Sequence, residues 1–201
     1  MLYWIGWSLF RFILITFGRW RVSGQENVPM EGAVILAPNH VSYADPPAAG
    51  CGIFRQVHYM AKIELFKIPI LGALIRGVGT FPVKQNTADR AAIRQALELL
   101  GKGKVVCIFP EGARSLDGKL MKAQAGLGMI ALKSKAPVVP VALIGTDKLL
   151  PRHSPFIHFA RVKIRYGKPM TFDELYDRGM DREAIEQVGD RVMAAIAEMQ
   201  E

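Results

Sequence analysis

The chain has 201 residues, half of them hydrophobic, which is enough for one domain with a substantial core and excludes a disordered or low-complexity protein. Its 26 basic residues against 18 acidic ones give a net charge of +8, which suits an anionic partner such as nucleic acid, a phosphate-bearing substrate or an anionic membrane surface. A soluble basic protein with no such partner has the same balance. The two cysteines, Cys51 and Cys107, have no metal-ligand spacing, which excludes a disulfide framework and a cysteine-based metal site.

Residues 1–20 are apolar almost throughout, and no acidic residue occurs before Glu26. A membrane-spanning helix needs about 20 apolar residues, and Arg11, in the middle of this run, would cost roughly 2.5–3.5 kcal/mol at bilayer mid-depth. The pattern therefore favours a helix that lies in, or dips into, one leaflet; the alternative is a core helix of the domain. In the leaflet, six aromatic and basic side chains are expected at the headgroup layer: Trp4, Trp7, Trp20, Arg11, Arg19 and Arg21.

After residue 20, apolar runs of strand length alternate with helical patterns. Strands are predicted at 20–23, 33–37, 58–61, 80–83, 105–109, 138–144 and 161–166. Helices are predicted at 45–54, in two short pieces within 64–76, and at 89–100, 123–134 and 181–199. This order predicts a single α/β domain over residues 21–201, with a mainly parallel mixed sheet flanked by helices and preceded by a membrane-associated helix at 1–20. Pro140 inside the run at 138–144 predicts an edge strand or a bulge.

A polar loop follows the predicted strand at 33–37 and contains His40 and Asp45. Histidine has the intrinsic pKa of a general base near neutral pH, and a carboxylate that binds its second ring nitrogen fixes the tautomer. Asp45 followed by Pro46 is also typical of a helix N-cap, which would leave His40 as an ordinary loop residue. A third possibility is that Ser42 joins the two in a hydrolytic Ser-His-Asp set, although the chain has no G-x-S-x-G elbow.

A second polar loop follows the predicted strand at 105–109 and contains Glu111, Gly112 and Arg114. Glycine allows the backbone to approach a ligand closely, and arginine binds phosphate bidentately. The alternative is a surface turn with an ion pair between Glu111 and Arg114. Because loops that leave the carboxyl ends of neighbouring parallel strands meet at one edge of a sheet, we expect both loops to form one site.

The blocks Asn39-His40-x4-Asp45 and Phe109-Pro110-Glu111-Gly112-x-Arg114-Ser115 resemble the first and third motifs of the glycerolipid acyltransferase family, particularly its 1-acylglycerol-3-phosphate acyltransferases. Val139-Pro140-Val141 is similar to the fourth block, and the resemblance covers roughly residues 22–167. It implies His40 as the base and Asp45 as its partner. It also implies Glu111, Gly112 and Arg114 as contacts of the acceptor phosphate or glycerol.

The second family block departs from its usual form here. An Asp-Arg pair normally follows a short apolar run, but Thr80-Phe81-Pro82-Val83 is followed by Lys84 and Gln85. Gln85 stands where the family arginine binds the acceptor phosphate. Lys84 or Arg90 is therefore expected to supply the missing positive charge, with a solvated lysine as the alternative for Lys84.

The resemblance implies direct acyl transfer from acyl-CoA or acyl-carrier protein, as co-substrate, to the sn-2 hydroxyl of 1-acylglycerol-3-phosphate, which gives phosphatidic acid. No covalent intermediate, metal or other cofactor is expected. The expected partners are the donor, a lysophospholipid and the cytoplasmic face of the cell membrane, with no nucleic acid. The alternatives are transfer to another lysolipid, a serine esterase, and a non-catalytic membrane-binding module.

Overall fold

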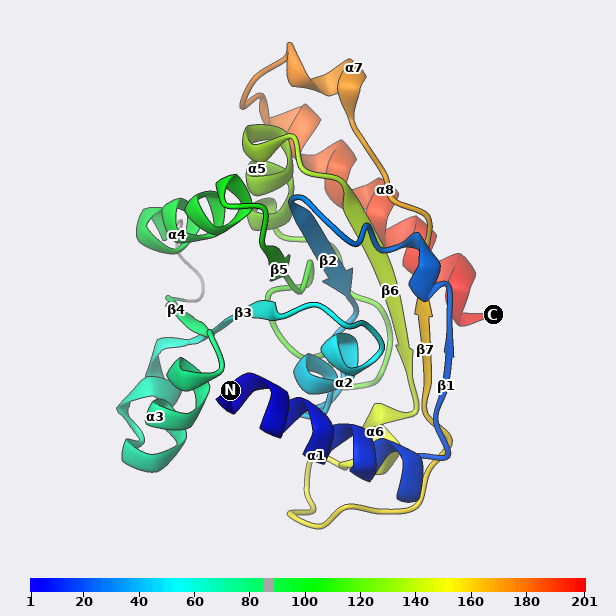
Figure 1. Cartoon of the computed structure of the whole chain (residues 1–201). Helices are drawn as coiled ribbons and strands as arrows, with labels where there is room; N and C mark the ends of the chain where they lie inside the picture. The colour runs from blue at the N-terminus through cyan, green and yellow to red at the C-terminus, as the bar shows by residue number, and fades with distance from the viewer. Residues whose placement is uncertain (85–88) are drawn as a thin grey trace.

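The computed structural model describes residues 1–84 and 89–201 (Figure 1). Its strands form one sheet in the order β1-β7-β6-β2-β5-β3-β4. The strands are β1 (Arg21–Ser23), β2 (Val34–Pro38), β3 (Val57–Lys62), β4 (Phe81–Val83), β5 (Val105–Cys107), β6 (Val138–Ile144) and β7 (Lys163–Tyr166). The α-helices are α1 (Leu2–Thr16), α2 (Asp45–Cys51), α3 (Pro69–Gly77), α4 (Arg90–Gly101), α5 (Ala125–Ser134), α6 (Thr146–Leu149), α7 (Asp173–Tyr176) and α8 (Arg182–Gln200), and short 3-10 helices occupy Gln25–Asn27 and Ile63–Lys67.

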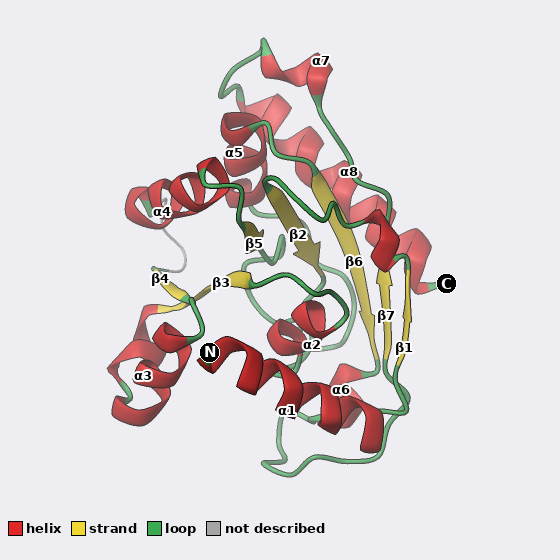
Figure 2. Ribbon diagram, in the orientation of Figure 1, coloured by secondary structure: helices red, strands yellow, loops and turns green. Residues whose placement is uncertain are grey.

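The predicted α/β class with a mainly parallel mixed sheet is confirmed. Every described strand pairing is parallel except the antiparallel pairing of β6 with β7. β2 is buried along its whole length, as expected of a strand covered on both faces. Helices α1 and α2 cover one face of the sheet, and α4, α5 and α8 cover the other (Figure 2).

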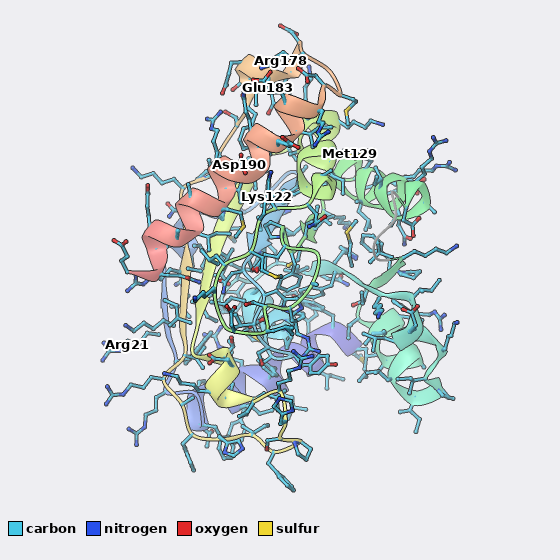
Figure 3. The ribbon with its side chains drawn as sticks, turned by 180° about the vertical axis from the view of Figure 1, so that it is seen from behind. Arg21, Lys122, Met129, Arg178, Glu183 and Asp190 are labelled. Carbon is cyan, nitrogen blue, oxygen red and sulfur yellow. The ribbon has the colours of Figure 1, made fainter. Side chains whose placement is uncertain are left out.

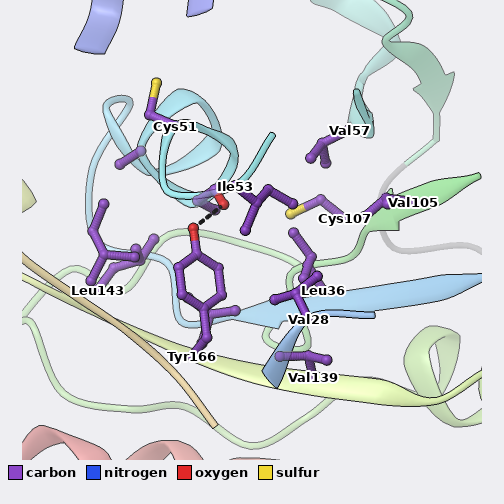
Figure 4. Close-up of a cluster of buried hydrophobic side chains, with 14 of the residues drawn as sticks. Val28, Leu36, Cys51, Ile53, Val57, Val105, Cys107, Val139, Leu143 and Tyr166 are labelled. Carbon is purple, nitrogen blue, oxygen red and sulfur yellow. Dashed lines mark hydrogen bonds between the residues drawn. The ribbon is translucent and has the colours of Figure 1, made fainter. Parts of the chain in front are cut away.

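Each face of the sheet has its own hydrophobic core. Leu36, Val139 and Ile164 point toward α1 and α2, whereas Ile35 and Val138, each one residue earlier along β2 and β6, point toward the other helices. This alternation is the period of a β-strand. Figure 4 shows the first core, in which the Tyr166 hydroxyl donates to the Ala49 carbonyl of α2 at 2.8 Å. Helix α2 is therefore fixed to the sheet by both packing and a buried hydrogen bond.

Of the two alternatives predicted for Pro140, the edge strand is wrong, because β6 lies between β2 and β7 near the centre of the sheet. The bulge is confirmed, because the three steps from Val141 back to Val138 lie opposite four steps from Tyr166 to Met170. Pro140 is paired with Ala37 of β2. On the other side its carbonyl accepts from the Gly167 amide, which follows the end of β7, and pairing resumes only at the bridge from Val138 to Met170. The proline is tolerated because it faces this interruption, where an amide donor is not needed.

The N-terminal helix α1 packs on α2 through one face. The Trp7 indole N–H contacts the Gly50 and Ile53 carbonyls, both at 3.2 Å, and Arg11 donates to the Cys51 carbonyl at 3.1 Å. The Arg11 guanidinium also lies 4.7 Å from the Trp7 ring centroid. Trp7 and Arg11 therefore serve the packing of α1 on the protein, and their expected position at a lipid headgroup layer stays a prediction.

The opposite face of α1 is apolar and exposed, and it includes Ile5, Leu9 and Phe12. Among the described residues, no helix has both the length and the hydrophobicity that crossing a membrane requires.

Candidate active site

The two polar loops meet because β2 and β5 are neighbouring parallel strands whose carboxyl ends lie at the same edge of the sheet. Asn39 follows β2 directly and continues its pairing with β6. Its side-chain amide donates to the Leu143 carbonyl at 3.1 Å and accepts from the Leu143 amide at 2.7 Å. Asn39 therefore fixes the point at which the chain leaves the sheet and the His40 loop begins.

His40 and Asp45 form the predicted pair. Nδ1 of His40 lies 2.8 Å from Oδ2 of Asp45, which is fully buried. An ionised carboxylate can only accept, so Nδ1 carries the proton and Nε2 is left as the basic nitrogen. Phe109 stacks on the imidazole with ring centroids 4.0 Å apart. The tautomer and the orientation of the ring are thus both fixed by contacts.

Asp45 is not the N-cap of α2. The helix begins at Asp45 itself, after Ala44, and no side chain caps it. Oδ2 of Asp45 instead accepts from the amides of Val41 and Ser42, each at 2.6 Å. The carboxylate therefore holds the preceding loop in a tight turn around His40.

Glu111 ties the two loops together. Oε1 accepts from the His40 amide at 2.8 Å and Oε2 accepts from the Met121 amide at 3.1 Å, while the His40 carbonyl accepts from the Ser115 amide at 2.8 Å. Burial raises the pKa of Glu111, and the two amide donors oppose that rise. The carboxylate is buried, so the alternative of a surface turn with an Arg114 ion pair is wrong. Its predicted contact with substrate stays a prediction.

Gly112 and Arg114 lie on the outer side of the same loop. Gly112 has a φ of +69°, a left-handed conformation that favours glycine. The Arg114 guanidinium lies 3.5 Å from the centroid of the Tyr43 ring, and it forms no ion pair with any residue in 1–84 or 89–201. A guanidinium held on one side by an aromatic face keeps its N–H groups for an anion. Neither Tyr43 nor Phe109 is assigned a role from the sequence; the available signal was that each polar loop carries an aromatic residue.

The structure brings Lys84 to the same edge of the sheet but not into the cluster. Lys84 follows β4, which lies two strands from β5 in the order β5-β3-β4, so it is roughly 10 Å along the edge at ordinary strand spacing. Its amide donates to Asp89, which caps α4 through the amides of Ala91 and Ala92. Arg90 begins α4 and is exposed. Gln85 lies outside the described residues, so the roles predicted for this block stay predictions.

Ser42 is placed to support the loop rather than to attack a substrate. Its buried hydroxyl donates to the Leu150 carbonyl at 2.9 Å and accepts from the Ala44 amide at 3.2 Å. The hydroxyl proton is therefore directed away from His40, whose Nδ1 is occupied by Asp45. This geometry disfavours the hydrolytic Ser-His-Asp alternative.

We expect Ser42→Ala to retain acyl transfer within a fewfold of wild type and to lower the free energy of unfolding by about 1 kcal/mol, the typical net value of a side-chain hydrogen bond. Turnover assays and urea unfolding test the two parts. An acyl group trapped on the wild-type protein by donor alone, and lost in Ser42→Ala, would instead establish Ser42 as a nucleophile.

Comparisons with known proteins agree with this site. The family model described as Acyltransferase matches residues 19–144, which include both loops. A 1-acyl-sn-glycerol-3-phosphate acyltransferase of Bacillus subtilis is 35% identical over 159 residues, covering 79% of this chain and 77% of the relative. A chloroplastic 1-acyl-sn-glycerol-3-phosphate acyltransferase of Arabidopsis thaliana is 30% identical over 83% of this chain, which spans only 46% of that longer protein.

Among solved structures, the 1-acyl-sn-glycerophosphate (LPA) acyltransferase PlsC of Thermotoga maritima superposes with a TM-score of 0.77 at 29% identity. The match covers 99% of this chain and 78% of the Thermotoga chain. The family model covers more than half of the chain, and the Bacillus relative passes 30% identity with most of its length matched. This chain therefore belongs to the acyltransferase family.

Proposed function

We propose that this acyltransferase transfers an acyl chain from a thioester to the sn-2 hydroxyl of 1-acylglycerol-3-phosphate, giving phosphatidic acid in phospholipid synthesis. The observation that carries the proposal is the His40–Asp45 pair, in which Nδ1 is bound to a buried carboxylate and Nε2 is left as a base. The names of the Bacillus and Thermotoga relatives support the choice of acceptor.

In this reaction, Nε2 of His40 takes the proton of the acceptor hydroxyl as its oxygen attacks the thioester carbonyl. Asp45 stabilises the imidazolium that forms. Collapse of the tetrahedral intermediate forms the ester and breaks the carbon–sulfur bond, and the proton passes from His40 to the leaving thiolate. The step requires no covalent enzyme intermediate. Backbone amides near the reacting carbonyl stabilise the developing oxyanion.

Arg114 is the residue we assign to the acceptor phosphate. It stacks on Tyr43 beside the His40 loop and forms no ion pair with the described residues, so its N–H groups are available to an anion. Holding the phosphate would position the hydroxyl at Nε2, and such positioning supplies much of the acceleration of a two-substrate reaction. Gly112 and Glu111 shape the loop that presents Arg114, and Lys84 or Arg90 adds positive charge farther along the edge.

We further propose that the protein works at the cytoplasmic face of the cell membrane, with the exposed side of α1 on the bilayer. Ile5, Leu9 and Phe12 face outward while Trp7 and Arg11 face the protein. An amphipathic helix with one face packed and the other apolar is typical of interfacial attachment. The donor, acyl-CoA or acyl-carrier protein, would approach from the aqueous side.

A panel assay tests the function. Purified protein is supplied with acyl-CoA or acyl-carrier protein and with lysolipids that differ in headgroup, and mass spectrometry identifies the products. We expect phosphatidic acid from lysophosphatidic acid, and we expect Arg114→Ala to lower kcat/KM for this acceptor by roughly 10- to 100-fold because a charge-assisted bidentate contact is lost.

The control is a phosphate-free acceptor such as a monoacylglycerol, whose weaker turnover should be little changed by Arg114→Ala. Equal losses with both acceptors would contradict phosphate binding by Arg114. Efficient acylation of a different lysolipid, with none of lysophosphatidic acid, would overturn the assigned acceptor.

A further inference from the structure

Large exposed hydrophobic side chains gather on three segments at one end of the molecule. They lie on α1, on the segment of the short helix α3, and in the loop of residues 150–162 that joins α6 to β7, which we call the α6–β7 loop. In that loop Phe156 is 74% exposed and Phe159 is 73% exposed, and Ile157 lies between them at 40%. Figure 1 shows the loop running beneath α1. Nothing in the proposed chemistry uses these side chains.

The α6–β7 loop is fixed to the end of α1 by backbone contacts. The Ala160 amide donates to the Phe17 carbonyl at 2.9 Å and the Val162 amide donates to the Gly18 carbonyl at 2.8 Å. The rings of Phe17 and Phe159 lie 5.1 Å apart. The exposed apolar residues of the loop and of α1 therefore belong to one surface whose parts are held in a defined arrangement.

The charged residues in the two stretches that carry α1 and the α6–β7 loop are all basic, and the exposed Asp147 of α6 lies just before the second stretch. No acidic residue occurs in residues 1–25 or in residues 148–172, two stretches that lie side by side where β1 pairs with β7. The basic residues of these stretches include Lys148, Arg152 and Arg161, which are exposed, and Arg21, which projects outward from the edge strand β1 (Figure 3). Exposed phenylalanines among predominantly basic residues are typical of a surface that enters an anionic bilayer. A second copy of the chain would bring like charges together, which opposes self-association through this face.

The α6–β7 loop is also bonded to the catalytic loop. The Leu150 carbonyl accepts from the Ser42 hydroxyl, two residues from His40, at 2.9 Å. The His158 amide in turn donates to the Leu149 carbonyl at 2.8 Å, which closes the base of the loop. Binding of the α6–β7 loop to a membrane would therefore also position the turn that carries His40.

From these contacts we infer that the α6–β7 loop is a second membrane-inserting element, in which Phe156 and Phe159 enter an anionic lipid surface beside α1 and seat the His40 loop against it. The inference rests on the proposed function only for the lipid acceptor; the lipid surface itself is recognised by exposed aromatic side chains and cationic residues. Attachment through α1 alone would leave Phe156 and Phe159 without effect on binding.

The test compares wild type with Phe156→Ser/Phe159→Ser in sedimentation with phosphatidylglycerol vesicles and with phosphatidylcholine vesicles. We expect the double variant to bind phosphatidylglycerol vesicles at least roughly tenfold more weakly, since two aromatic side chains no longer leave water. Binding of wild type should fall with salt and be weaker on phosphatidylcholine. The matched control is Met180→Ser, which removes a 39% exposed side chain. Its neighbour Arg178 lies at the far end of the molecule from α1 (Figure 3).

Two further readouts decide the interpretation. Activity on acceptor embedded in vesicles should fall with vesicle binding, whereas activity on a short-chain soluble acceptor should stay unchanged. Wild-type binding by the double variant, or an equal loss in Met180→Ser, would overturn the inference, as would a change in oligomeric state in place of a change in vesicle binding. If the double variant does not fold, Phe156→Ser alone carries the test, because Phe156 forms no ring contact with the described residues. Vesicle binding is measured without turnover, so a failure of the proposed acyl transfer is seen separately.

Discussion

His40→Ala is expected to lower kcat for acyl transfer by roughly 100- to 10,000-fold, the range that a positioned general base contributes. The imidazole is fixed by Asp45 at 2.8 Å and by the stacked Phe109 ring, so its Nε2 is preorganised as a base. Alanine leaves a buried carboxylate that still accepts from the Val41 and Ser42 amides. The turn therefore keeps its main support, and the loss should appear in turnover far more than in folding.

The measurement is steady-state turnover with a short-chain soluble acceptor, together with circular dichroism and vesicle binding. His153→Ala is the matched control for turnover and folding, since His153 is an exposed histidine outside the candidate active site. Vesicle binding of His40→Ala is compared with wild type, because His153 belongs to the α6–β7 loop. Turnover within tenfold of wild type in a folded His40→Ala protein would remove His40 from the role of base.

Glu111→Ala is expected to affect stability and turnover together, because Glu111 joins the two loops of the candidate active site through backbone amides rather than projecting toward solvent. Removal of the carboxylate leaves the amides of His40 and Met121 without acceptors. Hydrogen bonds to a charged group are worth about 1.5–3 kcal/mol each, so the loss of two should lower the free energy of unfolding by roughly 3–6 kcal/mol. Displacement of the His40 backbone should also lower kcat by roughly 100-fold, since small misplacements of a catalytic group have effects of that size.

Urea unfolding and turnover of Glu111→Ala, with Glu111→Gln as the conservative comparison, test this role. Glutamine retains one acceptor oxygen and should recover part of the stability. A residue that only contacts the acceptor would raise KM for lysophosphatidic acid and leave unfolding unchanged. That outcome would return Glu111 to the substrate-binding role suggested by the family resemblance.

Much of the fold and the pairing of the two loops could be predicted because the evidence is local. The run at 138–144 forms β6 with the predicted bounds, because the turns on either side of a continuous apolar stretch mark where the strand begins and ends. Polar residues directly after two buried parallel strands meet at one edge by the geometry of such sheets. His40 and Asp45 are close in sequence, so their contact needs only one turn of the chain.

The features that could not be predicted depend on partners far away in the sequence. The sequence around Glu111 does not show whether its carboxylate contacts the acceptor substrate or a backbone amide. Its actual partner, the amide of His40, lies 71 residues away and is known only from the fold. Pro140 is tolerated in a central strand because the pairing with β7 is interrupted beside it, and that pairing involves residues far away in the sequence. The sequence predicts that Arg11 meets lipid headgroups because it lies in an apolar run, yet in the structure it contacts the Cys51 carbonyl and the Trp7 ring.

The contacts of α1 with α2 have a consequence for how the protein can be handled. The carbonyls of Gly50, Cys51 and Ile53 lie at and just beyond the end of α2, where the last turn of a helix lacks intrahelical donors, and Trp7 and Arg11 supply those donors. The segment that would ordinarily be trimmed to obtain a water-soluble enzyme is therefore the C-terminal cap of the helix that begins with Asp45. Removal of residues 1–19 would expose the hydrophobic core between α1, α2 and the sheet and would loosen α2, which carries Asp45. Polar substitutions on the outer face of α1 would instead improve solubility and leave the cap of α2 in place.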